Sequence, residues 1–344
     1  MNTESNKRPL SLPFFSIGVT TYDRVEMLIE TINSILAQTF TDFEVIVSND
    51  NPNRTLSGES LGIDNPRVKF VNQPKNLGEF YNMQFLLKAS RGRYFTWLAD
   101  DDLYHPEFFL SAHRMLTKYN YPPCIFTSFG IAGEKRVIKT KDSVNADEML
   151  MSGADFLRQY LQRKIKAIGV MGFFNRDYLM SIGGLEDGSE DGKGMFCEYM
   201  LLLTTGMLDK VSYINAPLIF YRSHENAWGI KNIDAEMYKR AVQNLIRKSI
   251  MVLTGPTFRA SFYSFYSGFL SILRIGFINY FLVLRRSKRF SMKVWLSYLG
   301  EVWKYLFPLR KSDFYLPAVL ALIRVWTRFT MSAVWQDIIL HRQG

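Results

Sequence analysis

The sequence predicts an α/β protein whose mainly parallel sheet is followed by a basic, helical C-terminal region. Three observations carry this expectation. Strand-like and helix-like segments alternate over residues 14–98, polar residues follow three of the strand-like segments, and positive charge collects in the last third. A chain of 344 residues with 47% hydrophobic composition is long enough for one large domain and a smaller one.

The alternation begins with short apolar runs separated by segments of helical periodicity. Apolar residues recur at helical spacing over residues 25–36, and residues 83–89 also fit a helix. Strands separated by helices are typical of β–α–β units, which bring parallel strands side by side. The expected strands are residues 14–20, 43–47, 68–71 and 94–98.

The region after Pro106 is less regular. Residues 154–164 predict a helix, residues 186–194 (EDGSEDGKG) predict an acidic loop, and residues 196–203 are apolar around Glu198. Two short strands are expected on either side of Pro217, at residues 210–215 and 218–222.

Polar side chains cluster where the predicted strands end. Residues 20–23, 48–50 and 100–102 all follow strand-like runs. Ligands of open α/β sheets bind at the carboxyl edge of the strands, so these side chains are expected at a binding site. The triple aspartate 100–102 is read either as a solvated acidic turn or as a site for Mg²⁺ or Mn²⁺, which prefer carboxylate oxygen.

The ordered set of segments resembles the family 2 glycosyltransferases, which implies a catalytic domain with the GT-A fold. The resemblance covers roughly residues 13–228, after an N-terminal tail at 1–12 and before a helical region at 229–344. It implies the type of member that assembles bacterial surface polysaccharides such as O-antigen or capsule. The matching segments are IGVTTYDR (17–24), SILAQTFTDFE (34–44), NLG (76–78), RGRY (91–94) and the aspartates before Pro106.

The resemblance also implies which residues contact the donor, a nucleoside-diphosphate sugar. Thr20 and Tyr22 lie in the first loop, and Asp50 corresponds to the second acid of a pair after the second strand. The first acid of that pair is replaced here by Asn49, which is expected to alter base or ribose contacts.

The triple aspartate corresponds to the DxD-type motif of the family. Asp100 and Asp101 are expected to contact the donor nucleotide, with Asp100 on the ribose. Asp102 and Asp101, together with His224, are expected to hold Mn²⁺ or Mg²⁺. A strand-end histidine with no ligand is the other interpretation of His224.

Glu198 corresponds to the catalytic base of the family, although the acid that usually precedes the base is Cys197 here. Arg222 is expected near the diphosphate and acceptor. A base removes the acceptor proton while a metal stabilises the leaving diphosphate, so direct displacement with inversion is favoured over retention. Rival bases lie in the acidic loop: Asp187, Glu190 and Asp191.

Other functions are less well supported. The first β–α turn, GVTTYDRVEML, lacks both the G-x-G-x-x-G fingerprint and a Walker lysine, which disfavours other nucleotide-dependent enzymes. A non-catalytic protein that binds sugar nucleotides or acts as a scaffold stays open because of Asn49 and Cys197.

Residues 231–344 carry 18 Lys and Arg against 5 Asp and Glu. Three interpretations compete: a helical subdomain packed on protein, interfacial membrane helices within 260–335, and a transmembrane span at 260–284. Nucleic acid is not expected, because no binding motif accompanies the charge. No signal peptide is apparent. The family resemblance implies a protein that acts at the cytoplasmic face of the plasma membrane on a polyprenyl-diphosphate-linked glycan, and a homo-oligomer stays open.

Overall fold

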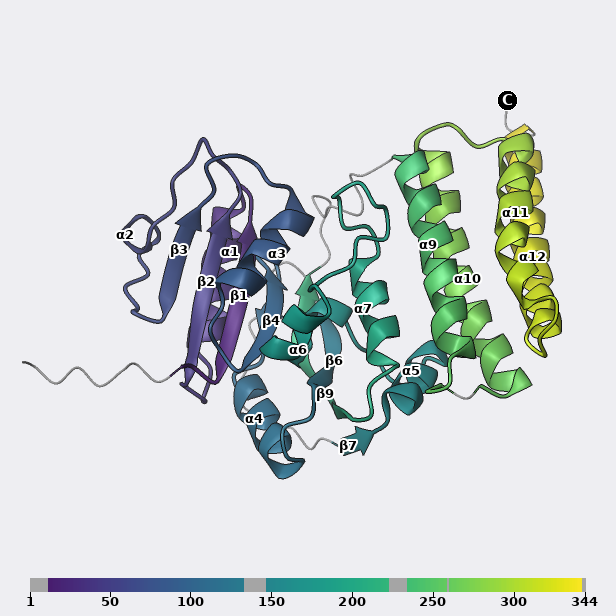
Figure 1. The fold of residues 1–344 in the computed structure, drawn as a ribbon. Helices are drawn as coiled ribbons and strands as arrows, with labels where there is room; N and C mark the ends of the chain where they lie inside the picture. Colours follow the sequence, from purple (N-terminus) through teal and green to yellow (C-terminus); the bar gives the residue numbers. More distant parts are fainter. Residues whose placement is uncertain (1–11, 133–146, 223–233, 259, 342–344) are drawn as a thin grey trace, which may run out of the picture.

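The computed structural model describes residues 12–132, 147–222, 234–258 and 260–341, with side chains described as far as residue 330. Figure 1 shows a sheet-containing part joined to a stack of long C-terminal helices. The predicted α/β class, with parallel strands and a helical C-terminal region, is confirmed.

Among the described residues, nine strands form one sheet in the order β3-β2-β1-β4-β8-β6-β9-β5, with β7 paired to β9. The first four of these strands are parallel, whereas β8 pairs antiparallel with both β4 and β6. The strands are β1 (Phe15–Thr21), β2 (Phe43–Asn49), β3 (Val68–Asn72), β4 (Tyr94–Ala99), β5 (Leu103–Tyr104), β6 (Cys124–Ala132), β7 (Glu148–Met151), β8 (Phe173–Asn175) and β9 (Val211–Arg222).

The central strands are buried on both faces, which explains why they read as continuous apolar runs. Every residue of β1 and β2 is buried. Ile17 of β1 lies opposite Val45 on one side and Thr96 on the other, so the carboxyl ends of β1, β2 and β4 meet at one edge. This register brings the polar strand ends together as expected.

Helices flank this sheet. In α1, the residues Leu28, Thr31, Ile32 and Ile35 form the buried face that the helical spacing predicts. The helices of this part are α1 (Val25–Leu36), α2 (Gly58–Leu61), α3 (Glu79–Ala89), α4 (Phe108–Lys118), α5 (Gly153–Leu161), η1 (Gly169–Met171), α6 (Arg176–Ser181) and α7 (Cys197–Thr205).

The expectation of two strands around Pro217 is wrong, because β9 runs unbroken through it. Proline has no backbone N–H to donate to a neighbouring strand. The pairing of β6 with β9 shifts register around Ser128, which lies opposite Pro217. A β-bulge at this point lets the strand continue past the missing donor.

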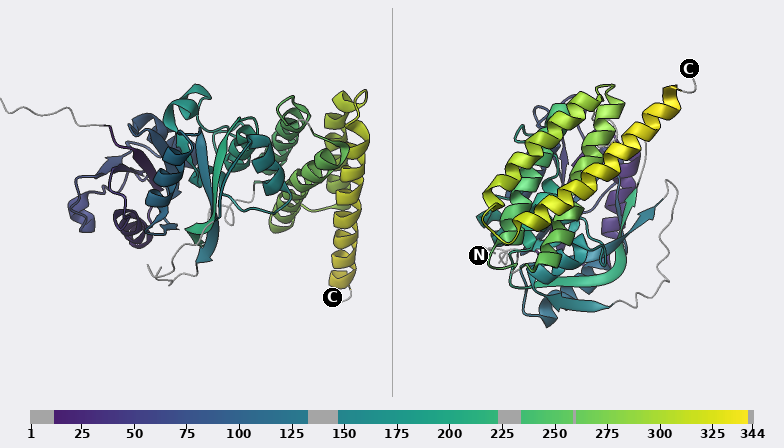
Figure 2. Two further views of the ribbon diagram at one scale, coloured as in Figure 1. Left: turned by 90° about the horizontal axis from the view of Figure 1, so that it is seen from below. Right: turned by 90° about the vertical axis from the view of Figure 1, so that its right-hand side faces the viewer.

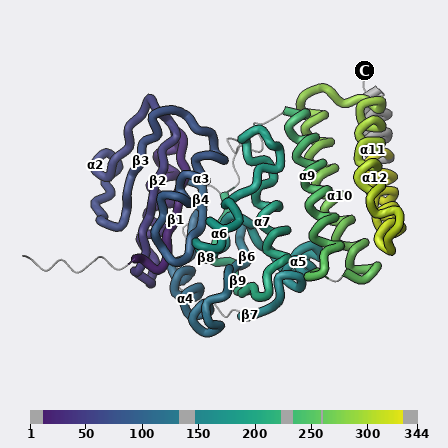
Figure 3. The backbone as a smooth tube through the Cα atoms, in the orientation of Figure 1, coloured from purple at the N-terminus to yellow at the C-terminus, as the bar shows by residue number. Residues whose placement is uncertain are grey.

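The C-terminal helices stack at the end of the molecule farthest from β3 (Figures 2 and 3). They are α9 (Ala235–Thr254), α10 (Phe262–Arg286), α11 (Met292–Leu306), η2 (Phe307–Leu309) and α12 (Tyr315–His341). Among the described residues, only α10 is long and apolar enough to cross a membrane, and 61% of its apolar window is buried inside the protein.

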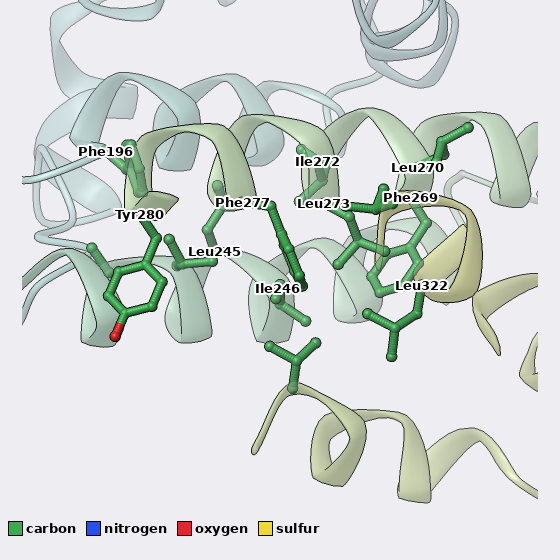
Figure 4. Close-up of a cluster of buried hydrophobic side chains, with 14 of the residues drawn as sticks. Phe196, Leu245, Ile246, Phe269, Leu270, Ile272, Leu273, Phe277, Tyr280 and Leu322 are labelled. Carbon is green, nitrogen blue, oxygen red and sulfur yellow. The ribbon is translucent and has the colours of Figure 1, made fainter. Parts of the chain in front are cut away.

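One hydrophobic core joins the C-terminal helices to the sheet-containing part. Leu157, Leu161 and Leu203 belong to the same buried cluster as the inner faces of α9, α10 and α12. Figure 4 shows Phe196 beside this layer, with Leu245 of α9 and Phe277 of α10 among its members. The C-terminal region therefore packs on the sheet-containing part, which is the first of its three interpretations.

Candidate active site

A cavity of about 900 Å³ opens where the strand ends face helix α7. Thr20 lines it from the end of β1, Asp101 and Asp102 line it from the loop after β4, and Glu198 lines it from α7. The C-terminal helices complete the wall with Tyr238 of α9 and with Ser271, Ile275 and Asn279 of α10. Residues from both halves of the chain thus share one cavity.

Arg24 offsets the repulsion within the triple aspartate. Its guanidinium pairs with the Asp100 carboxylate and, at 2.7 Å, with that of Asp101. Thr21 Oγ1 also donates to Asp100 Oδ2 at 2.6 Å. Burial raises the pKa of Asp100, whereas Arg24 opposes that rise. Burial would lower the pKa of Arg24, but the two aspartates more than reverse this, so the arginine stays charged.

Asp102 is almost fully buried but touches the cavity. Its Oδ1 accepts the backbone N–H of Arg222 at 2.9 Å, which ties the end of β4 to the end of β9. Burial, followed by the charge of Asp101, raises the pKa of Asp102 well above its usual range. A nearby cation would favour the charged form.

The residues present fit a divalent cation. In the described part of the chain, no group of three or more His, Cys, Asp and Glu side chains is arranged to hold a metal, and His224 lies outside it. Mg²⁺ and Mn²⁺ commonly use only one or two carboxylates together with substrate phosphates. Asp101 and Asp102 offer that set at the cavity wall.

Glu79, at the start of α3, is a cavity residue that the sequence reasoning missed. Its Oε1 accepts a hydrogen bond from Thr20 Oγ1 at 2.7 Å. Desolvation by the surrounding protein raises the pKa of Glu79 to about 7, although the side chain lines the cavity. The negative charge of Asp100 adds to that rise. Its position directly after the NLG segment was the available signal. Thr20 therefore lines the cavity with its hydroxyl group hydrogen-bonded to Glu79.

Asp50 holds the loop before α3. Its two oxygens accept the backbone N–H groups of Leu77 and Gly78 at 2.7 and 2.9 Å. Asp50 and Asp100 are not among the residues that line the cavity. The contact of Asp50 with the donor base stays a prediction.

The structure explains why asparagine replaces an acid at position 49. Its Nδ2 donates to Asn72 Oδ1 at 2.9 Å and also to the backbone oxygen of Asn51. A carboxylate has no proton to donate and would face these acceptors with a like charge. Asn49 therefore braces the loop after β2.

Glu198 lies in the first turn of α7, directly after Phe196 and Cys197, and faces the cavity. Burial raises the pKa of Glu198 to about 6. The backbone of η1 approaches it closely: a Cβ added to Gly169 would lie 2.1 Å from the Glu198 carbonyl oxygen. Glycine at 169 is what allows this packing.

The rival bases of the acidic loop do not line the cavity. Asp187 accepts the backbone N–H groups of Ser189 and Gly192 at 2.8 and 2.6 Å, and Asp191 pairs with Arg240 at 2.8 Å. Glu190 is exposed and has a φ of 57°. Of these four acids, Glu198 alone borders the cavity.

Arg222 does not line the cavity, in contrast to its expected place near the diphosphate. Its side chain is 3% exposed, and its guanidinium pairs with Glu30 and donates to the backbone oxygen of Asp101. The neighbouring Tyr221 does line the cavity. Burial raises its pKa, and Asp102, Asp101 and Glu198 add to this, so Tyr221 stands near both sets of acids. Tyr22 is 48% exposed and lies outside the lining.

Comparison with known proteins agrees with this architecture. Residues 16–182 match the family model described as glycosyl transferase family 2. This segment is a family 2 glycosyltransferase domain, so the resemblance noted from the sequence is confirmed.

The relatives match this chain over only part of their own length. An uncharacterized glycosyltransferase of Rickettsia bellii is 30% identical over 121 residues, which cover 35% of this chain and 17% of the relative. The Campylobacter jejuni GalNAc(5)-diNAcBac-PP-undecaprenol beta-1,3-glucosyltransferase is 36% identical over 94 residues, covering 26% of this chain and 30% of the relative. The chain thus spans less than a third of these relatives.

The crystal structure of S. aureus TarS residues 1–349 superposes with a TM-score of 0.56 at 13% identity, covering 90% of each chain. The complex of the same protein with UDP has a TM-score of 0.56 at 14% identity, covering 91% of this chain and 88% of the other. At this identity the likeness concerns the fold, and the GT-A fold expected from the sequence is confirmed.

Proposed function

We propose that the protein is a glycosyltransferase that moves a sugar from a nucleoside-diphosphate sugar to a hydroxyl group of a glycan acceptor. The observation that carries this proposal is the shared cavity, which has Asp101 and Asp102 on its strand-end wall and Glu198 on its α7 wall. The family 2 match of residues 16–182 supports the same reaction class.

The donor belongs at the strand-end wall. Asp101 and Asp102 would hold a Mn²⁺ or Mg²⁺ ion, which supplies positive charge to stabilise the leaving diphosphate. Arg24 already bridges Asp100 and Asp101, so it competes for the carboxylate that a cation would use. Asp100 is fully buried and is held by Thr21 and Arg24, so it supports this wall, and its expected contact with the ribose stays a prediction.

The acceptor belongs beside Glu198. A carboxylate whose pKa is about 6 is charged at neutral pH and remains basic enough to take the proton of an acceptor hydroxyl. The acceptor oxygen then attacks the sugar from the side opposite the diphosphate, which inverts the anomeric centre. Tyr221, near both sets of acids, is suited to contact the transferred sugar.

We further propose a lipid-linked acceptor and docking of the C-terminal helices on the cytoplasmic membrane surface. Exposed apolar side chains accompany the basic residues of this region: Phe262, Tyr263, Ile278, Leu282, Leu316, Leu320, Ile323 and Trp326. The name of the C. jejuni relative specifies a lipid-linked glycan, which supports this class of acceptor. Apolar faces beside Lys and Arg suit anionic headgroups.

A panel of sugar nucleotides tests the reaction. We expect nucleoside diphosphate to be released from at least one donor and the release to depend on Mn²⁺ or Mg²⁺. Asp102→Asn should abolish metal-dependent turnover and weaken Mn²⁺ binding measured by electron paramagnetic resonance. No turnover with any donor, with Mn²⁺ bound normally, would instead favour a non-catalytic binding protein.

Membrane docking is tested by flotation with vesicles that contain anionic phospholipid. We expect the protein to float with these vesicles at low salt and to be released at high salt, because surface charges are screened. Protein that stays unbound at low salt would contradict the docking.

A further inference from the structure

Four arginines converge where the cavity meets the C-terminal helices. Arg163 lies in the loop after α5, Arg274 lies on α10, and Arg324 and Arg328 are one turn apart on α12. Burial lowers the pKa of Arg274, and the charges of Arg328, Arg324 and Arg163 lower it further, so these three lie close to it. We call this set the arginine cluster.

The cluster has no compensating acid. Within the described residues, none of its four guanidinium groups forms an ion pair with a carboxylate. Arginine stays protonated in proteins, so the repulsion is not relieved by loss of a proton. Arg24, by contrast, pairs with two aspartates that neutralise its charge. A bound anion would relieve the repulsion.

The backbone around the cluster is held in place. Ser271 Oγ donates to the Leu161 carbonyl oxygen at 2.7 Å, which joins α10 to the end of α5 beside Arg163. Arg324 Nη1 donates to Tyr266 Oη at 3.1 Å, which joins α12 to α10. The helices that carry the cluster are therefore fixed relative to one another, as a binding site requires.

The cluster is continuous with the active-site cavity. Arg163 itself lines the cavity, and so do Ser271 and Ile275, which flank Arg274 on α10. Exposed apolar residues adjoin the cluster: Ile278 lies one turn after Arg274, and Ile323 is next to Arg324 on α12. A ligand bound there would adjoin both the sugar-transfer cavity and exposed apolar side chains.

We propose that the arginine cluster binds the phosphate or diphosphate group that joins the acceptor glycan to its apolar carrier, which places the glycan hydroxyl in the cavity near Glu198. This rests on the proposed sugar transfer. Guanidinium groups bind phosphate oxygens in paired hydrogen bonds, and several together suit a diphosphate. The apolar residues beyond the cluster suit the lipid end of such a molecule.

The direct test uses inorganic pyrophosphate as the probe in isothermal titration calorimetry, with EDTA present so that no divalent cation carries pyrophosphate into the donor site. Wild-type protein is expected to bind pyrophosphate, and Arg274→Gln/Arg328→Gln is expected to bind it at least about tenfold more weakly. The control, Lys288→Gln/Arg289→Gln, removes the same charge from exposed positions after α10 and is expected to change affinity less than about twofold. Equal weakening by both variants, or none by the cluster variant, overturns the site.

Vesicles distinguish a lipid-linked phosphate from ordinary headgroups. If the cluster only attracts the membrane, its variant will reduce flotation with phosphatidylglycerol vesicles as the control does and leave pyrophosphate binding unchanged, which overturns the proposal. If the proposal holds, the cluster variant raises the KM for a prenyl-diphosphate-linked acceptor by about tenfold or more, while donor hydrolysis without acceptor is unchanged. If the wild-type protein hydrolyses none of the donors, the proposed function is rejected. The pyrophosphate titration does not depend on hydrolysis, so it still tests the arginine cluster on its own.

Discussion

Glu198 and Asp50 show how the surroundings give different roles to two carboxylates that were both expected at the active site. Glu198 borders the cavity, no side chain in the described part of the chain pairs with its carboxylate, and burial raises its pKa to about 6. Asp50 has both oxygens occupied by backbone N–H groups of one loop. The first arrangement favours proton transfer, whereas the second favours structural support.

Glu198→Gln is expected to lower kcat by about 10²–10⁴-fold, since an amide cannot take the acceptor proton. Donor KM should change little. Because the pKa of Glu198 is raised, the wild-type rate should increase as pH rises through about 6 and then level off. Steady-state kinetics across pH checks both. The control is Glu190→Gln, at an exposed rival position, which should keep full activity; undiminished turnover of Glu198→Gln would reject the assignment.

Asp50→Asn is expected to reduce the free energy of unfolding by about 1.5–3 kcal/mol, because one charge-assisted hydrogen bond to the 77–78 loop is lost. Urea unfolding followed by circular dichroism measures this. Asp64→Asn makes the same chemical change at an exposed position and should stay within about 0.5 kcal/mol of wild type. If the two variants are equally stable, Asp50 does not brace the loop.

At the scale of elements, the close approach of η1 to α7 positions the proposed base. Gly169 of η1 packs directly on the backbone of Glu198, so the start of α7 is held by a contact that only glycine permits. The same loop leads back to Arg163 and the end of α5. A small shift of α7 would move Glu198 relative to the donor wall.

Gly169→Ala is expected to lower kcat more than about tenfold, because reacting groups must be held within a fraction of an ångström. The added Cβ would lie 2.1 Å from the Glu198 oxygen, and overpacking of this kind should also cost about 1–3 kcal/mol of stability. Activity and thermal denaturation are measured together. Gly300→Ala, in α11 with no atom within 4 Å of the new Cβ, should instead stabilise by about 0.5–1 kcal/mol. A fully active Gly169→Ala protein would show that the contact does not position the base.

At the scale of the whole molecule, one hydrophobic cluster joins the two halves. Leu161 of α5 and Leu203 of α7 are buried in the same cluster as Phe277 and Leu322 of the C-terminal helices. The cavity wall is also shared, since Tyr238 and Ser271 line it. The helices are thus part of the site and of its stability.

We therefore expect one cooperative unfolding transition. Phe277→Ala removes a ring that is 0% exposed, and it should lower the unfolding free energy by about 3–5 kcal/mol while keeping a single transition. Calorimetry tests this, with and without the nucleoside diphosphate that the donor panel identifies, on the same samples. Leu282→Ala, at a residue that is 42% exposed, is the control and should have little effect. Two separate transitions, with the donor site surviving loss of the helices, would contradict a shared core.

Much of the fold was predictable because its signals are local. The buried strands β1, β2 and β4 are apolar runs, and α1 repeats its apolar residues at helical spacing. The strand break predicted at Pro217 was wrong. A proline without an N–H group interrupts a strand only where no β-bulge accommodates it.

The candidate site was predictable in part. Asp101, Asp102 and Glu198 were expected at the site and do line one cavity, whereas Glu79 was missed and Arg222 proved to be buried away from it. Pairings such as Arg24 with Asp100 join residues 76 positions apart, and no local pattern reports them.

The sequence by itself determined the order of strands and helices and the presence of acids at the strand ends, because backbone periodicity and turn chemistry act over short stretches of chain. Tertiary structure alone decided which acids face the cavity, which arginine neutralises the aspartates, and which arginines gather without an acid. Burial and charge balance depend on residues that are distant in sequence, and only folding brings these together.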